Sequence, residues 1–533
     1  MLTFTRLTQS TQNFFRWLDT RSDKQDYLLC LLLGALNALA MPPVYFFPIL
    51  LVTFPLFIRL LDKSLITFRA AFKTFLFFFS FHLFGLYWIS AALFVDIANN
   101  WWVLPFALSG LPALMASYPA LAVALWQRMA WQGSARLLAL IVLLAATEWV
   151  RGWMFTGFPW NSWGYAWTAF LPLMQSVAIF GVYGLSLLTL IFACLPVFFT
   201  RHYHDRFSRA FCGIFAAFVI GLVAWGAGRL HIQLPQQESA ALIRIVQPNI
   251  AQEVKWDPQT RLANERKLWM HSIQPNTTQN GKQPDVVIWP ETSLTLFDTI
   301  DVRRLNAAME ELLPPTTTLA AGIMEIETDE NDQREYFNRL SLYRHGQRLA
   351  TYDKSHLVPF GEFLPFQQYW PVKPVAFKNG SMTRGQGVTT VALDNLPSFS
   401  PLICYEVLFP GATALNKPRP KWILNITNDA WYGNTSGPYQ HLAITRTRAI
   451  EEGLPVFRAA NTGVSAVIDP FGRILAKLPL NSEGVIDHEL PQSLKKTIFA
   501  RFGNTTFLVL LLALWGIAWG WQRTRVPTLA SIK

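Results

Sequence analysis

The N-terminal part of the chain consists of long apolar runs separated by short polar connections. The runs cover 27–41, 44–61, 74–95, 101–126, 137–150, 171–199 and 210–227, and an eighth run covers 505–521. A helix needs roughly 20 consecutive apolar residues to cross a bilayer. The pattern therefore predicts about eight transmembrane helices. The fifth run contains Glu148, which could pair with Arg151 one turn further on.

Residues 229–503 have the pattern of a soluble α/β domain. Short apolar runs predict strands at 242–246, 285–289, 318–323, 340–343, 348–352, 388–393, 400–404, 422–426 and 466–469. Apolar residues at helical spacing predict a helix over 302–313, with Asp301 as its N-cap and Pro314-Pro315 as its stop. We expect three parts: a membrane domain at 1–228, this domain at 229–503, and a last helix with a short tail at 504–533.

Composition and charge agree with a membrane protein and argue against a nucleic-acid-binding one. Of the 533 residues 52% are hydrophobic and 15% are charged, whereas a soluble domain has about 25% charged residues. The net charge is +11, but residues 229–503 contain 28 Lys/Arg and 27 Asp/Glu, and the remainder contains 17 and 7. The basic excess thus lies beside the apolar runs, where topogenic charge is expected.

The distribution of Lys and Arg predicts the orientation. If the N-terminus is cytoplasmic, sixteen basic residues lie in the termini and short connections on that side, and Arg151 alone lies in the opposite short loops. This bias places both termini in the cytoplasm and residues 229–503 on the outer face. The first run also has features of a secretory signal, but further apolar runs follow it at once, which favours a membrane anchor.

The four cysteines do not suggest a disulfide framework. Cys30, Cys194 and Cys212 fall inside apolar runs, and Cys404 is the one cysteine of the 229–503 block. A lone thiol there is either a buried structural residue or a nucleophile, and the cysteine count leaves both open. The histidines of this block lack ligand spacing, so we expect no metal and no other cofactor.

Three polar residues each follow an apolar strand, and together they favour the nucleophile. They are Glu291, Lys354 and Cys404. A thiol is mostly protonated at neutral pH and needs a base, for which Glu291 is the candidate. Lys354 is a fixed cation that could stabilise the oxyanion of a tetrahedral intermediate. Glu362 and Glu406 are expected to be auxiliary acids that hold Lys354 or act on the leaving group.

Longer motifs around these residues resemble the apolipoprotein N-acyltransferase family, a membrane branch of the nitrilase superfamily. The matching stretches are Trp289-Pro290-Glu291, Tyr352-Asp353-Lys354, Leu357 to Glu362, Cys404-Tyr405-Glu406, Gln247-Pro248-Asn249, Lys255-Trp256, Asn428 to Trp431, Glu148-Trp149, Arg151-Gly152 and Thr156 to Trp160. The resemblance covers nearly the whole chain. It implies an αββα sandwich on a bundle of about eight helices, and a Glu-Lys-Cys triad at Glu291, Lys354 and Cys404.

The resemblance also implies a reaction and a location. Cys404 would take an acyl chain from a membrane phospholipid and pass it, through a thioester, to the α-amino group of a diacylglyceryl-cysteine at the N-terminus of an apolipoprotein. Trp256, Tyr405 and Trp431 would contact the acyl chain or gate the site. The protein would lie in the bacterial inner membrane with its catalytic domain in the periplasm.

Two other functions remain open at this stage. A membrane-tethered amidase would use the same triad with water as the acceptor. A transporter or channel with an outer binding domain would make the triad a coincidence, but its apolar runs contain few polar residues that could mark a pathway.

Overall fold

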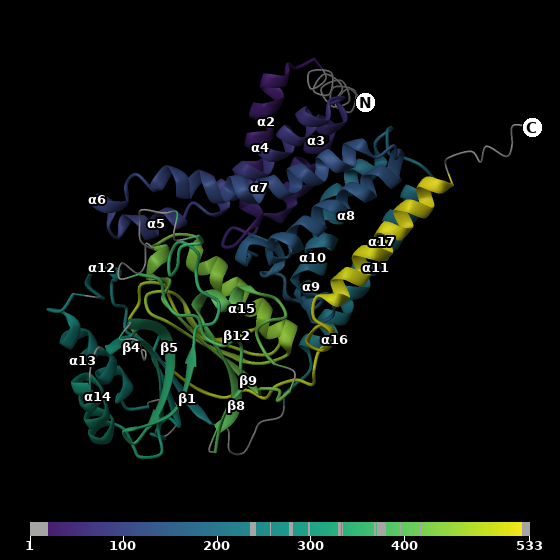
Figure 1. Cartoon of the computed structure of the whole chain (residues 1–533). Helices are drawn as coiled ribbons and strands as arrows, with labels where there is room; N and C mark the ends of the chain where they lie inside the picture. Colours follow the sequence, from purple (N-terminus) through teal and green to yellow (C-terminus); the bar gives the residue numbers. More distant parts are fainter. Residues whose placement is uncertain are drawn as a thin grey trace, which may run out of the picture.

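The computed structural model contains a helical bundle and, against one end of it, a domain built on two β-sheets (Figure 1). The structure describes residues 20–524 except 235–240, 256, 277–280, 297–298, 329–331, 333, 367–368, 370–379, 395 and 416. The C-terminal helix returns to the bundle after the sheet domain and lies beside the helix that leads into that domain.

Each of the eight apolar runs contains a helix of the bundle. These helices are α2 (Asp23–Asn37), α3 (Leu50–Asp62), α4 (Thr67–Gly85), α7 (Leu104–Arg128), α8 (Gly133–Arg151), α10 (Val177–Cys194), α11 (Arg206–Leu230) and α17 (Thr505–Arg523). Within the described residues, α7, α8, the 177–199 segment, α11 and α17 are long and apolar enough to cross a membrane. The predicted count of about eight spanning helices is therefore not confirmed.

Helix breakers and charges explain why the first three runs fall short. Pro42, Pro43 and Pro48 interrupt the chain, so α2 and α3 have 15 and 13 residues. The third run divides after Gly85 into α4 and the short α5 (Ile89–Phe94), and α4 begins with two basic residues in its first two turns. The remaining short turns are η1 (Ala38–Ala40), η2 (Phe47–Ile49), α6 (Ile97–Asn100), η3 (Met154–Thr156), η4 (Trp163–Trp167), α9 (Leu171–Met174) and η5 (Leu195–Phe199).

The pairing predicted for the fifth run is confirmed and anchors an outer loop of the bundle. Arg151 Nη2 lies 3.8 Å from Glu148 Oε1, and both side chains are buried. Arg151 Nη1 donates hydrogen bonds to the carbonyls of Phe158 and Trp160 at 2.9 and 2.6 Å. The ion pair therefore fixes the loop that faces the sheet domain.

All nine predicted strands are present, and four more complete the two sheets. The first sheet contains β1 (Leu242–Gln247), β2 (Val286–Ile288), β3 (Leu294–Leu296), β4 (Thr318–Thr328), β5 (Arg334–Arg344), β6 (Gln347–Asp353) and β13 (Gly484–Glu489), in the order β13-β1-β2-β4-β5-β6 with β3 beside β4. The second contains β7 (Val391–Leu393), β8 (Leu396–Ile403), β9 (Trp422–Thr427), β10 (Val456–Ala460), β11 (Ser465–Ile468) and β12 (Ile474–Leu478), in the order β12-β11-β10-β9-β8-β7.

The sheets pack face to face, because alternate strand residues such as Ile245, Ile288 and Leu424 form a core between them. The other face of the first sheet is covered by α13 (Arg261–Ser272) and α14 (Thr299–Leu312), and α15 (Gly437–Glu452) covers the second sheet. The αββα sandwich is therefore confirmed. The N-cap prediction was wrong, because α14 begins at Thr299 and Asp301 lies in its first turn, 2.7 Å from Arg261.

One seam joins the sandwich to the bundle along α15 and α10 (Figure 1). Helix α10 is broken at Gly181, which has φ 66° and lies where a Cβ would come within 2.3 Å of Phe499 in α16 (Ile498–Phe502). The N–H of Val182, freed by this break, donates to Glu451 Oε1 of α15 at 2.7 Å. A carboxylate of the sandwich thus satisfies the backbone of a bundle helix.

Candidate active site

Glu291 lies just beyond the carboxyl end of β2, at the edge where several strands end. Its Oε1 accepts hydrogen bonds from Lys354 Nζ at 3.1 Å and from Asn338 Nδ2 at 2.7 Å. Its Oε2 accepts from the backbone N–H of Asn428, the residue after β9, at 2.8 Å. In the first sheet β2 is parallel to β4, and two antiparallel pairings give β6 the same direction, so Glu291 and Lys354 lie at the same sheet edge. Asn428 comes from the facing second sheet.

Lys354 follows β6 and lies between two carboxylates. Its Nζ donates to Glu362 Oε1 at 2.8 Å as well as to Glu291, and the residue is 1% exposed. Burial alone would lower the pKa of Lys354, but Glu291 and Glu362 raise it well above its usual value. Burial likewise would raise the pKa of Glu291, but Lys354 and Asn338 hold it below its usual value. The site is therefore an ionised pair with a second carboxylate behind the cation.

Cys404 occupies a strained turn between β8 and the 3₁₀ turn η7 (Cys404–Leu408). Its φ is 51°, in the left-handed region that costs a non-glycine residue about 1–2 kcal/mol. Burial and the neighbouring carboxylate of Glu291 raise the pKa of the thiol to about 12, although Lys354 opposes them. The thiol is thus protonated at neutral pH and has a base and a cation near it.

This pKa predicts how Cys404 reacts with iodoacetamide. Because the thiol pKa is raised, the thiolate fraction should increase about tenfold per pH unit from pH 7 to 9.5, whereas a free cysteine levels off above about 8.5. Alkylation of the Cys404 peptide, followed by mass spectrometry beside a model cysteine peptide, measures this. A plateau below pH 9 would show instead a preformed thiolate paired with Lys354.

Glu362 and Glu406, predicted together as auxiliary acids, have different surroundings. Glu362 holds Lys354 and accepts from the Val358 N–H at 2.8 Å. Glu406 makes its hydrogen bonds elsewhere. Its Oε1 accepts from Tyr352 and from Ser355, and its Oε2 accepts from the Ile403 N–H at 2.8 Å. These bonds tie the end of β8 to the segment after Lys354.

The three predicted aromatic contacts also differ. Tyr405 is buried, and its hydroxyl donates to the Gly157 carbonyl of the bundle at 2.7 Å. Trp431 lies half-buried in the 3₁₀ turn η8 (Asp429–Tyr432). Trp256 lies outside the described residues. Tyr405 therefore contacts the bundle loop, on the side of the site that faces the membrane domain.

Three residues near Glu291 and Cys404 were missed by reasoning from the sequence. Asn338 lies inside β5 and bridges Glu291 and Glu362, with its Nδ2 3.1 Å from Glu362 Oε1. The hydroxyl of Tyr432 lies 3.9 Å from Cys404 Sγ. Lys255, at the end of α12 (Gln252–Lys255), donates to the Glu291 carbonyl at 3.0 Å, and burial lowers its pKa to about 7. Of these three residues, only Lys255 lies in one of the motifs that resemble the family, the pair Lys255-Trp256.

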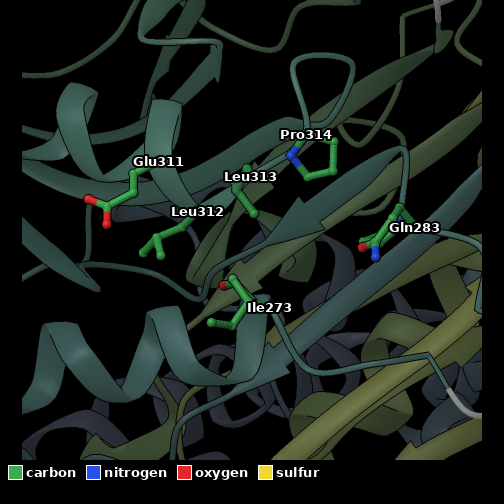
Figure 2. Close-up of a pocket in the computed structure, with 8 residues that line it drawn as sticks. Ile273, Gln283, Glu311, Leu312, Leu313 and Pro314 are labelled. Atoms are coloured by element: carbon green, nitrogen blue, oxygen red, sulfur yellow. The ribbon is translucent and has the colours of Figure 1, made fainter.

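Figure 2 shows a surface pocket formed by other residues. It has a volume of about 330 Å³ and is lined by Ser272, Ile273, Gln283, Pro284, Glu311, Leu312, Leu313 and Pro314. These residues precede β2 and β4, so the pocket lies at the amino ends of these strands, whereas Glu291 lies beyond the carboxyl end of β2. It does not belong to the candidate active site.

Comparison with known proteins identifies both halves of the chain. Residues 242–498 match the carbon-nitrogen hydrolase family model, and residues 33–195 match the model of the apolipoprotein N-acyltransferase N-terminal domain. The chain is 40% identical over 502 residues to the apolipoprotein N-acyltransferase of Rhodopseudomonas palustris, covering 91% of this chain and 93% of that protein.

Two further relatives carry the same name. That of Bradyrhizobium diazoefficiens is 37% identical, with 91% of this chain and 93% of the relative covered. That of Rickettsia prowazekii is 36% identical, with 90% and 95% covered. The resemblance stated from the motifs is confirmed, and the chain belongs to the apolipoprotein N-acyltransferase family of membrane acyltransferases in the nitrilase superfamily.

Proposed function

We propose that the protein transfers an acyl chain from a membrane phospholipid to the α-amino group of a diacylglyceryl-cysteine at the N-terminus of an apolipoprotein. In the first step the Cys404 thiol attacks the ester carbonyl while Glu291 takes its proton. The ester C–O bond breaks, the lysophospholipid oxygen receives the proton, and an acyl thioester remains. In the second step the amine attacks, the C–S bond breaks and the thiol is restored.

The electrostatics of the site support the first step. A protonated thiol cannot attack without a base, and the depressed pKa of Glu291 keeps that carboxylate in the ionised form that a base must have. Lys354 stays charged and is fixed by two carboxylates, so it needs no rearrangement to stabilise the oxyanion. Glu362 keeps the cation in place when Glu291 becomes neutral.

The position of the Cys404 thiol beside the helical bundle is the observation that supports a lipid substrate. Tyr432, whose hydroxyl approaches Cys404, packs against Trp88 of the bundle at 4.6 Å between ring centroids. Trp88 directly precedes α5, and the chain there exposes Tyr87, Phe94 and Trp101 by 46%, 59% and 67%. The thiol thus lies beside aromatic side chains that pack onto the bundle next to a segment with exposed aromatic residues, a position suited to lipid-anchored substrates.

The test is to detect the thioester. After incubation of the purified protein with phospholipid in detergent micelles, the Cys404 peptide should carry an acyl group that hydroxylamine removes. A diacylglyceryl-cysteine peptide should then discharge it as an amide. A labile adduct discharged by water as fast as by the amine would favour the amidase, and no adduct on a folded, alkylatable Cys404 would refute the phospholipid donor.

We also propose that the catalytic domain, residues 229–503, lies on the periplasmic face of the inner membrane with both termini in the cytoplasm. The Lys/Arg bias supports this, and Arg523 lies at the end of α17 remote from the sandwich (Figure 1). Trypsin added to intact spheroplasts is expected to cleave at exposed residues such as Lys421. If the domain is protected from trypsin until the membrane is permeabilised, the domain lies on the cytoplasmic side and the proposed orientation is wrong.

A further inference from the structure

A short segment between β1 and α13 contacts the main chain that carries Glu291. The segment ends in α12, and its last residue, Lys255, is half-buried. Lys255 Nζ donates to the carbonyl oxygen of Glu291 at 3.0 Å and to Thr292 Oγ1 at 2.9 Å. Thr292 Oγ1 in turn donates to the same carbonyl at 2.8 Å. The amine and the hydroxyl therefore hold the carbonyl of Glu291 together.

The same segment reaches the carboxylate of Glu291 through Asn428. Gln252, the first residue of α12, is buried, and its Oε1 accepts from Asn428 Nδ2 at 2.7 Å. The N–H of Asn428 is the group that donates to Glu291 Oε2. Asn461 Nδ2 donates to the carbonyl of Ile250 at 2.7 Å and to Asn428 Oδ1 at 3.0 Å. One segment is thus tied both to the main chain of Glu291 and to the donor that its carboxylate uses.

The main chain around Glu291 is a place where such contacts matter. Thr292 has φ 49°, in the left-handed region that a β-branched residue rarely adopts. Strand β4 also lies very close, because a Cβ on Gly322 would come within 2.3 Å of the Pro290 carbonyl oxygen and 2.7 Å of Glu291 Cα. A strained backbone persists only where its surroundings hold it, and Lys255 supplies two of the hydrogen bonds that do so here.

We propose that Lys255 is a positioning residue for the acylation of Cys404: its amine holds the turn at Glu291 and Thr292, and this turn aims the carboxylate of Glu291 at the thiol. Gln252 supports the same carboxylate through Asn428. The inference rests on the proposed acyl transfer. It assigns Lys255 a role in the rate of thiol acylation and none in binding the phospholipid.

The charge of Lys255 provides a measurement that a merely structural role would leave unchanged. Among the described residues, the charged or titratable groups that face Glu291 are Lys354, with Glu362 behind it, Lys255, Cys404 and Tyr432. Burial would raise the pKa of Glu291, but Lys354, Asn338 and Lys255 lower it. Since burial brings the pKa of Lys255 to about 7, this amine is charged wherever Glu291 titrates. Its removal should raise the pKa of Glu291, so acylation should fall off at a higher pH on the acid side.

Two substitutions test the role of Lys255. Lys255→Met keeps the length of the side chain and removes the amine. We expect it to slow acylation of Cys404 per folded molecule by roughly 10-fold to 100-fold, to leave the apparent KM for phospholipid unchanged, and to move the acid-side fall in rate to higher pH. Thr292→Val removes the hydroxyl and leaves the cation, so it should slow the same step by a smaller factor without moving the acid side. Single-turnover acylation from about pH 4 to about pH 8 measures both.

The control is Lys63→Met, because Lys63 Nζ also donates to a main-chain carbonyl, that of Arg21 at 2.6 Å, but does so in the bundle after α3. It should lower thermal stability without changing the rate or its pH profile. A rate and a pH profile for Lys255→Met equal to those of Lys63→Met, or a raised KM alone, would overturn the inference. If Lys255→Met does not fold, Thr292→Val decides, and a wild-type rate in that variant would overturn it.

A second acyl donor separates this inference from the proposed function. Each variant is also acylated with p-nitrophenyl butyrate, an activated ester that reacts with a thiol without a phospholipid. If the wild type reacts with this ester but not with phospholipid, the proposed donor is wrong, and the rate of Lys255→Met relative to the wild type with the activated ester still decides the role of Lys255. Acylation of the wild type by neither ester would overturn both.

Discussion

Replacing Glu291 with glutamine is expected to slow thioester formation by about 10²- to 10⁴-fold. The substituted amide can still accept a hydrogen bond from Asn338, but it cannot take the proton of a thiol whose pKa burial has raised to about 12. Lys354 keeps Glu362 as its partner, so the fold should survive. The measurement is single-turnover acylation of the Cys404 peptide by phospholipid, followed by mass spectrometry.

Glu265→Gln is the matched control for this substitution. Like Glu291, Glu265 is a buried carboxylate in an ion pair, with Arg304 at 3.0 Å, but it lies on α13, which covers the other face of the first sheet. It should reproduce the effect of losing a buried carboxylate without changing the acylation rate. Acylation by Glu291→Gln at the control's rate would show that another group is the base.

Lys354→Met should have two separate effects. It removes the cation that lies between Glu291 and Glu362, and leaving two buried carboxylates without it should lower the free energy of unfolding by about 3–5 kcal/mol. It also removes the fixed positive charge at the developing oxyanion, which should slow acylation by about 10²- to 10³-fold per folded molecule. Thermal unfolding in detergent measures the first effect, and single-turnover acylation measures the second.

A second buried lysine separates the two effects. Lys73, on α4 in the bundle, is 1% exposed and lies 2.9 Å from Asp26. Lys73→Met should lose stability for the same reason but acylate normally once folded. A comparable loss of rate per folded molecule in both variants would mean that Lys354 contributes through folding alone, and would remove its role at the oxyanion.

Strands with continuous apolar sequence could be predicted, because a short apolar run between turn residues is typical of a strand that is buried on both faces. The four missed strands either contain polar residues or are very short. β10 contains Arg458, which is buried and paired within the fold. β12 and β13 are partly exposed strands with mixed sequence, and β3 has only three residues. The predicted count of about eight spanning helices is not confirmed, because apolar composition does not show where a run such as 74–95 divides, as it does after Gly85.

Glu291, Lys354 and Cys404 could be proposed from the sequence because each lies at or just beyond the end of a predicted strand, and the structure pairs Glu291 with Lys354. Asn338 could not, since it lies inside a strand, and its approach to Glu291 depends on the register of β5 with β4 and β6. The position of Tyr432 depends on how η8 lies against the bundle. Contacts of that kind exist only once two parts of the chain have packed together.

The seam at Gly181 and Glu451 has a consequence for how such proteins can diversify. A bundle taken without its sandwich would leave the Val182 N–H unpaired where little water can replace Glu451, and a sandwich taken alone would leave α15 uncovered. The two matched halves are therefore not interchangeable modules. A chimera of two relatives should assemble only if the parent that supplies the bend in α10 also supplies the carboxylate that meets it, so recombination across this seam is constrained to inherit both together.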